Sequence, residues 1–126
     1  MTDQDEPDAL LILQRVEAMI MYGRTALRQF PKYELHVLSA EMRRCMWDLL
    51  ELVIICNKRY HKKTTMKDLD AKVALLRYQL RTAKKFGYLD FKKYEHWSKL
   101  NDEIGRMLGG WLRSISISTL TVGDAR

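Results

Sequence analysis

Apolar residues recur along the chain at alternating spacings of three and four residues in four separate segments. This spacing places them on one stripe of an α-helix, as in helices that pack side by side. We therefore predict four helices, at about residues 8–30, 35–60, 68–86 and 91–115. The predicted stripes are Ala9, Leu13, Val16, Ile20, Gly23, Leu27 and Phe30; Leu35, Leu38, Met42, Cys45, Leu49, Leu52 and Cys56; Leu69, Val73, Leu76, Leu80 and Ala83; Trp97, Leu100, Ile104, Met107, Trp111 and Ile115.

The breaks between the segments carry residues that begin or end helices. Pro31 stops the first helix, Gly87 suits a left-handed cap after the third, and Asp90 is a good N-cap for the fourth. Long helices joined by short connections favour an all-α, up-down-up-down four-helix bundle. We expect one domain over residues 1–116, followed by a loosely held C-terminal tail at 117–126.

Composition narrows the fold class and the location. The 126 residues include only two prolines and six glycines, too few for the many tight turns of a sandwich or barrel, and 47% of them are hydrophobic, too many for disorder. No uncharged apolar run approaches the ~20 residues that span a bilayer. Because neither a signal peptide nor a membrane anchor is recognisable, we expect a cytoplasmic protein with no membrane partner.

The sequence offers little for catalysis. It has no nucleophile elbow, no phosphate-binding glycine loop and no paired cysteines at zinc spacing. Cys45 and Cys56 lie eleven residues apart in one predicted helix, about 16 Å along its axis, so they read as buried thiols. His36, His61 and His96 are scattered. We therefore expect no catalytic residue, no metal and no cofactor; the alternative, a small enzyme with an intersubunit site, would depend on His61 or His96.

The second predicted helix has more apolar surface than one bundle position needs. Beside its core stripe it carries Trp47, Leu50 and Ile54 on an adjacent row. A helix that is apolar around most of its circumference is buried again by another subunit in a protein of this size. We therefore predict a homo-oligomer with these three residues in its interface.

Positive charge is concentrated in two stretches. The formal net charge is +6, but Asp3, Asp5, Glu6 and Asp8 form an acidic N-terminal tip, and from residue 9 onward 22 basic residues face 12 acidic ones, a net of +10. A field of this sign attracts nucleic acid, although a solvated lysine-rich face has the same composition. The residues predicted to bind a partner or nucleic acid are Lys58, Arg59, Lys62, Lys63, Arg77, Arg81, Lys84, Lys85, Arg106 and Arg113.

The third helix holds the best candidate contact surface. Arg77, Arg81, Lys84, Lys85 and Tyr88 recur at intervals of three and four residues along one edge. Since an arginine fork binds phosphate or carboxylate, this edge suits RNA or an acidic protein patch, and the alternative is an ordinary basic flank.

The fourth predicted helix contains three glycines within a stretch of six residues. Glycine lowers helix stability, so Gly105 and Gly109, which share one face, indicate close approach by another helix. A phosphate loop is the weaker alternative, because no strand precedes the pattern.

Two stretches resemble a known family. The segments 74–81 (ALLRYQLR) and 103–111 (EIGRMLGGW) are similar to the accessory variability determinant proteins, a four-helix-bundle family that includes the ribosomal-RNA intervening-sequence proteins. The resemblance covers about residues 10–115. The family's arginine pair corresponds to Arg77 and Arg81, and its glycine and tryptophan pattern to Gly105, Gly109 and Trp111. The acidic tip and the tail depart from the family pattern.

The resemblance implies a role. A member of this family is a non-catalytic accessory subunit of a diversity-generating retroelement, which binds the reverse transcriptase while the complex copies template RNA into error-prone cDNA during mutagenic retrohoming. It also implies a basic homopentameric ring that contacts RNA or DNA. The alternative is a stand-alone RNA-binding bundle of the intervening-sequence type.

Overall fold

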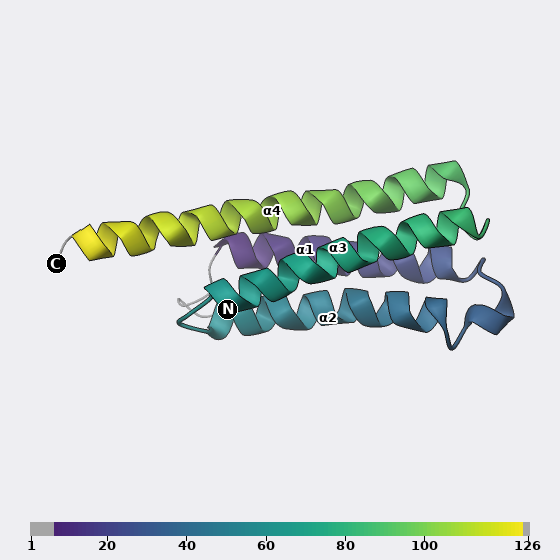
Figure 1. Ribbon diagram of the computed structural model, residues 1–126, viewed down its shortest axis with the longest axis horizontal. Coiled ribbons are helices and arrows are strands. Elements are labelled where there is room, and N and C mark those ends of the chain that lie inside the picture. Colours follow the sequence, from purple (N-terminus) through teal and green to yellow (C-terminus); the bar gives the residue numbers. More distant parts are fainter. Residues whose placement is uncertain (1–6, 125–126) are drawn as a thin grey trace.

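Four α-helices form an antiparallel bundle in the computed structural model, which describes the backbone of residues 7–124 and side chains as far as 116. The elements are α1 (Pro7–Leu27), the short 3-10 helix η1 (Lys32–Glu34), α2 (Leu38–Lys58), α3 (Lys63–Lys85) and α4 (Phe91–Asp124). Each helix packs on the next, and α1 packs on α4, which closes the bundle (Figure 1). The predicted all-α four-helix bundle is confirmed.

Several helix boundaries differ from the prediction. The second helix begins at Leu38 rather than near 35, because η1 and a turn closed by the Val37 N–H and the Glu34 carbonyl, 3.0 Å apart, come first. The third begins at Lys63 rather than near 68. The fourth continues to Asp124 instead of ending at 115, and Figure 1 shows it running past the ends of the other helices.

Residues 117–124, which we predicted to belong to a loosely held tail, continue the helix α4. No proline or glycine lies between Trp111 and Val122, so no residue in this stretch stops the helix. At the other terminus, the acidic residues of the tip up to Glu6 lie outside the described residues, and Asp8 stands in the first turn of α1.

Of the 25 residues predicted for the core stripes, 17 are buried. All five residues predicted for α3 are buried. In α1 the buried residues include Ile12 and Met19, whereas Leu13 and Ile20, which we predicted, are only half-buried. In α2, Val53 takes the place predicted for Leu52. Leu35 is exposed, because it lies before α2 begins.

An amide occupies the core between α3 and α4. Asn101 and Leu108 are buried where we predicted Leu100 and Met107. The Asn101 Nδ2 donates to the Val73 carbonyl at 3.0 Å. This hydrogen bond offsets the cost of burying the NH₂ group of the amide, and it joins α4 to α3 at Val73.

The close approach that requires glycine is at Gly23, not at Gly105 or Gly109 of α4. A Cβ on Gly23 would lie 2.7 Å from Met46 Cε and 2.8 Å from Trp97 Cζ2, so any side chain there would collide with both neighbouring helices. A Cβ on Gly105 would meet Val73 at 3.4 Å, and the nearest neighbour of one on Gly109 is Arg113 of α4 itself, at 3.6 Å. Within one chain, the predicted close approach at Gly109 is therefore wrong.

The turn between α3 and α4 is closed by its backbone, as the sequence predicts. Gly87 has a φ of 82°, in the left-handed region. The Tyr88 N–H donates to the Ala83 carbonyl and the Gly87 N–H to the Lys84 carbonyl, both at 2.9 Å, which is a Schellman cap. Asp90 Oδ1 accepts the Lys93 N–H at 2.8 Å, which caps α4.

Both cysteine side chains are buried, as predicted. Cys45 donates from Sγ to the Lys72 carbonyl at 3.3 Å, and burial raises the pKa of this thiol to about 11. Within the described residues, no helix is long and apolar enough to cross a membrane, and no three potential ligands gather at a metal site.

Candidate nucleic-acid and partner interface

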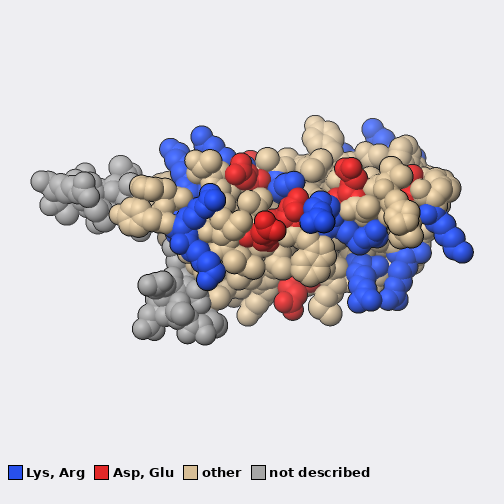
Figure 2. Space-filling view, turned by 90° about the horizontal axis from the view of Figure 1, so that it is seen from below, with Lys and Arg blue, Asp and Glu red and all other residues tan. Residues whose placement is uncertain are grey.

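Charge is distributed unevenly along the bundle. Lys and Arg side chains gather toward both ends in Figure 2, whereas the acidic side chains lie mainly along the middle. We call residues 58–67 the α2–α3 end. Residues 32–34 and 84–93, which η1 and the Gly87 turn bring together, form the α3–α4 end. The two ends hold their cations in different ways.

At the α2–α3 end, two predicted site residues are engaged within the chain. The half-buried Lys62 donates from Nζ to the Cys56 carbonyl at 2.8 Å, to the Asn57 carbonyl at 3.2 Å and to the Arg59 carbonyl. Arg59 donates from Nη1 to Thr65 Oγ1 at 2.9 Å. The ammonium therefore caps the C-terminus of α2, where the helix dipole favours a cation, and the role of Lys62 in a binding surface stays a prediction.

The neighbouring side chains at this end point outward. Lys58 and Lys63 are exposed, as predicted for binding residues. Tyr60, 90% exposed, is in edge-to-face contact with His61, with ring centroids 4.9 Å apart. This end therefore presents cations with one exposed tyrosine.

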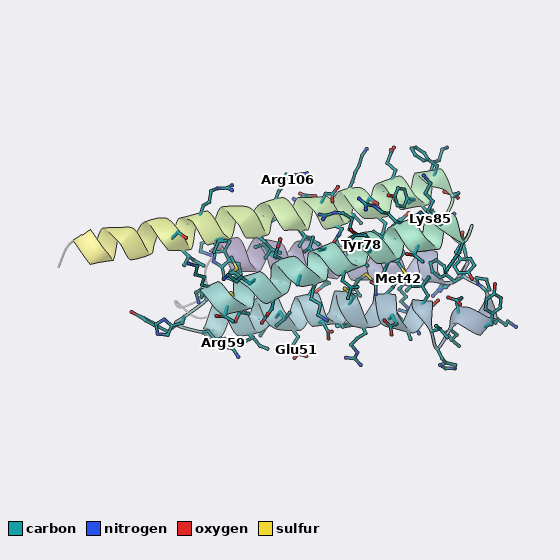
Figure 3. All side chains as sticks on the ribbon, viewed as in Figure 1. Met42, Glu51, Arg59, Tyr78, Lys85 and Arg106 are labelled. Carbon is teal, nitrogen blue, oxygen red and sulfur yellow. The ribbon has the colours of Figure 1, made fainter. Side chains whose placement is uncertain are left out.

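The arginine pair lies on the exposed side of α3 beside α4. Arg77 Nη2 is 3.5 Å from Asp102 Oδ1, which joins α3 to α4. Arg81 lies over the ring of Tyr78, with Cζ 5.3 Å from the ring centroid (Figure 3 labels Tyr78). Both guanidinium groups are thus oriented by a neighbour while their residues are exposed to solvent.

Farther along α3, the two predicted lysines differ. Lys84 crosses to α4, where its Nζ lies 4.7 Å from the Tyr94 ring centroid and 5.2 Å from that of Phe91. Lys85 is exposed (Figure 3). Lys84 therefore makes cation–π contacts within the chain, whereas Lys85 extends into solvent.

Exposed aromatic rings surround these lysines, and most of them were not among the predicted site residues. Tyr33 is 72% exposed, Phe86 59% and Phe91 61%. Tyr88 donates its hydroxyl to that of Tyr33 at 3.2 Å, a hydrogen bond that raises the pKa of Tyr88 to about 12. The Phe86 and Tyr88 ring centroids are 5.5 Å apart. The available signal was the recurrence of aromatic residues within the short stretch 86–91, in a turn where no core is expected.

The remaining predicted cations lie on α4. Arg106 and Arg113 are both exposed (Figure 3 labels Arg106). Nη1 of Arg113 lies 3.6 Å from where a Cβ on Gly109 would stand, so the arginine side chain runs back over the glycine surface of its own helix. The glycine surface on this part of α4 is therefore lined by a cation.

The apolar row on α2 is at the surface, as its prediction requires. Trp47 is 52% and Ile54 40% exposed, and Leu50 is half-buried. These residues line a shallow groove of about 650 Å³ together with Arg43 and Glu51 (Figure 3 labels Glu51). The groove is lined by α2 alone, so it is an open helix face rather than an enclosed pocket.

Comparison with known proteins adds one finding. Residues 10–115 match the model of the family described as bAvd-like. No curated protein matches the chain.

Proposed function

This chain belongs to the bAvd-like family, the bacterial accessory variability determinants of diversity-generating retroelements, and on that premise we propose that it binds the retroelement's reverse transcriptase. In this proposal it is a non-catalytic subunit. It also contacts template RNA or cDNA through its basic surface during mutagenic retrohoming.

The observation that carries the proposal is the arginine pair on α3. Arg77 and Arg81 are exposed one helical turn apart, and Asp102 and the Tyr78 ring orient them. A guanidinium that a neighbour already positions loses less conformational entropy when it binds a carboxylate or phosphate. The pair therefore suits a specific contact with a partner better than a flexible lysine does.

Capture of the co-encoded reverse transcriptase by the tagged full-length chain tests this contact. We expect the double variant Arg77→Ala, Arg81→Ala to lose most of the capture, with helicity unchanged. Arg24→Ala, Arg28→Ala is the control, because it removes two exposed arginines of the same sequence spacing, one in the last turn of α1 and one in the turn that follows. An equal loss of capture in both variants would mean that the effect comes from the total positive charge and not from a specific contact of Arg77 and Arg81. RNA binding without any polymerase capture would instead support the intervening-sequence alternative.

Self-association through the α2 face completes the proposal. Trp47, Leu50 and Ile54 would be covered by a second copy, and the family implies a pentamer. We expect light scattering to give an oligomeric mass for the wild type and a smaller one for Trp47→Lys. Met21→Lys is the control, because Met21 is an apolar side chain 66% exposed on α1. A strictly monomeric wild type would contradict this part of the proposal.

A further inference from the structure

We propose that the α3–α4 end is a platform on which the bases of single-stranded nucleic acid stack. Its stacking surfaces are the rings of Tyr33, Phe86 and Phe91, and Lys84 and Lys85 supply charge beside them. The inference rests on the proposed nucleic-acid contact and names the form of nucleic acid and the side chains that would bind it.

The first argument is exposure. Tyr33, Phe86 and Phe91 are each more than half exposed, and all three lie at the same end of the bundle. The core beneath them is completed by Phe30 and Leu89, which are buried. Exposed aromatic rings grouped in one place are a feature of binding surfaces, because each leaves a large apolar area in water.

The second argument is that Tyr88 links these turns. It is half-buried, its hydroxyl bonds that of Tyr33 in η1, and its ring lies 5.2 Å from Phe30 and 5.5 Å from Phe86. Lys84 lies over Phe91. Rings that are positioned before binding lose little conformational entropy when a base stacks on them.

The third argument is charge. The α3–α4 end contains five lysines, Lys32, Lys84, Lys85, Lys92 and Lys93, and two acidic residues, Glu34 and Asp90. Asp90 is engaged in the cap of α4 and bonds Lys93 Nζ at 3.1 Å. The excess of lysine over acid complements a phosphate backbone, and the rings complement bases; proteins that bind single strands combine these two features.

The single-stranded form follows from stacking geometry. In a duplex the base faces are covered by neighbouring base pairs, so a protein ring reaches them only where the strand is unpaired. Template RNA and nascent cDNA both contain such segments. The α2–α3 end is the internal comparison, because it presents Tyr60 with His61 while Lys62 and Arg59 are engaged within the chain.

Two probes with equal phosphate charge separate stacking from electrostatics. One is a labelled oligothymidylate of about twenty nucleotides, and the other is an abasic strand of the same length; fluorescence anisotropy reports binding of each to the full-length protein. Because stacking contributes about 1–3 kcal/mol per base, we expect the wild type to bind oligothymidylate at least ~5-fold more tightly. The variant Phe86→Leu, Phe91→Leu should lose most of this preference and keep its affinity for the abasic strand.

Two further variants make the test specific. Tyr60→Leu, the matched control at the α2–α3 end, should keep the preference for bases. The double variant Lys84→Gln, Lys85→Gln should bind both strands more weakly. It should also lower the slope of log K against log salt by about 0.7 for each phosphate that the protein no longer neutralises.

The outcomes distinguish the inference from the proposed function. A wild type that binds both strands equally, or a leucine variant that retains the full preference, overturns the platform while leaving nucleic-acid binding intact. A wild type that binds neither strand overturns the nucleic-acid contact itself, and the polymerase capture is then judged separately. A leucine variant that loses the polymerase but keeps the preference would identify this end as a protein-docking surface, which also overturns the inference.

Discussion

The α2–α3 end and the α3–α4 end are both rich in cations, but their turns are closed by different chemistry. At the α3–α4 end, Gly87 adopts the left-handed conformation and the side-chain carboxylate of Asp90 caps α4. At the α2–α3 end the residue before α3 is Lys62, which makes no side-chain cap there and instead bonds carbonyls at the end of α2.

The difference shows that charge in a sequence does not measure the charge available for binding. A glycine and an aspartate satisfy the helix ends of one turn, so no lysine is needed as a cap there, and Lys85, Phe86 and Phe91 are exposed. The other turn lacks both residues, and a lysine takes over the cap. The α3–α4 end is therefore better suited to bind a partner, although the run at 58–67 has the more uniform charge.

The largest expected effect comes from removing the capping ammonium. Lys62→Met keeps much of the apolar stem and leaves the Cys56 and Asn57 carbonyls without this donor. Hydrogen bonds to charged groups contribute about 1.5–3 kcal/mol, so we expect urea unfolding to show a loss of about 1–3 kcal/mol at this partly exposed site.

The exposed Lys63 is the matched control, since Lys63→Met removes the same charge one residue later. It should change stability by less than about 0.5 kcal/mol. Equal losses would mean that Lys62 acts only as general charge and that the two ends do not differ as described.

The sequence predicted the number of helices and their order because the spacing of apolar residues is regular. It did not resolve which of two apolar neighbours faces inward. Ile12 and Leu13 are adjacent apolar residues, as are Met19 and Ile20, so the buried member depends on the orientation of α2 and α4 rather than on α1 alone. Asn101 was missed for a related reason, because its hydrogen bond to Val73 exists only once α3 is in place.

The candidate site was predicted as a set of lysines and arginines. In the structure, some of these side chains are exposed and others bond to groups within the chain. The sequence correctly placed Arg77 and Arg81 on one exposed edge, since helical spacing determines that. It did not predict that Lys62 turns inward, because a long flexible side chain finds carbonyls that are close only in the folded turn. Nor did it predict Tyr33 beside Tyr88, because those residues are 55 apart in the chain.

A smaller effect is expected from the glycine that closes the α3–α4 end. Gly87→Ala forces a side chain into the left-handed region, which costs about 1–2 kcal/mol, and no atom lies within 4 Å of the new Cβ to add a clash. Gly109→Ala is the opposing control: the position is helical and meets only Arg113, at 3.6 Å, so alanine should stabilise by up to about 1 kcal/mol. The melting temperatures of the two variants should therefore shift in opposite directions. A Gly87→Ala variant as stable as the wild type would contradict the claim that this turn requires a glycine in the left-handed conformation.

The smallest effect, and the sharpest in its pH dependence, concerns Asp90. The Lys93 N–H and ammonium hold the pKa of this carboxyl below its ordinary value of 3.8. Because the folded pKa is the lower one, the charge stabilises the fold above pH 3.8, and this contribution is lost as pH falls through the folded pKa. Melting temperatures of Asp90→Ala and the wild type should differ most near neutral pH and converge in strong acid. The deficit of Lys62→Met should lack this dependence, because Lys62 donates to backbone carbonyls and no carboxylate takes part. Parallel pH profiles for the two variants would contradict the assignment of a carboxylate cap to one end and a lysine cap to the other.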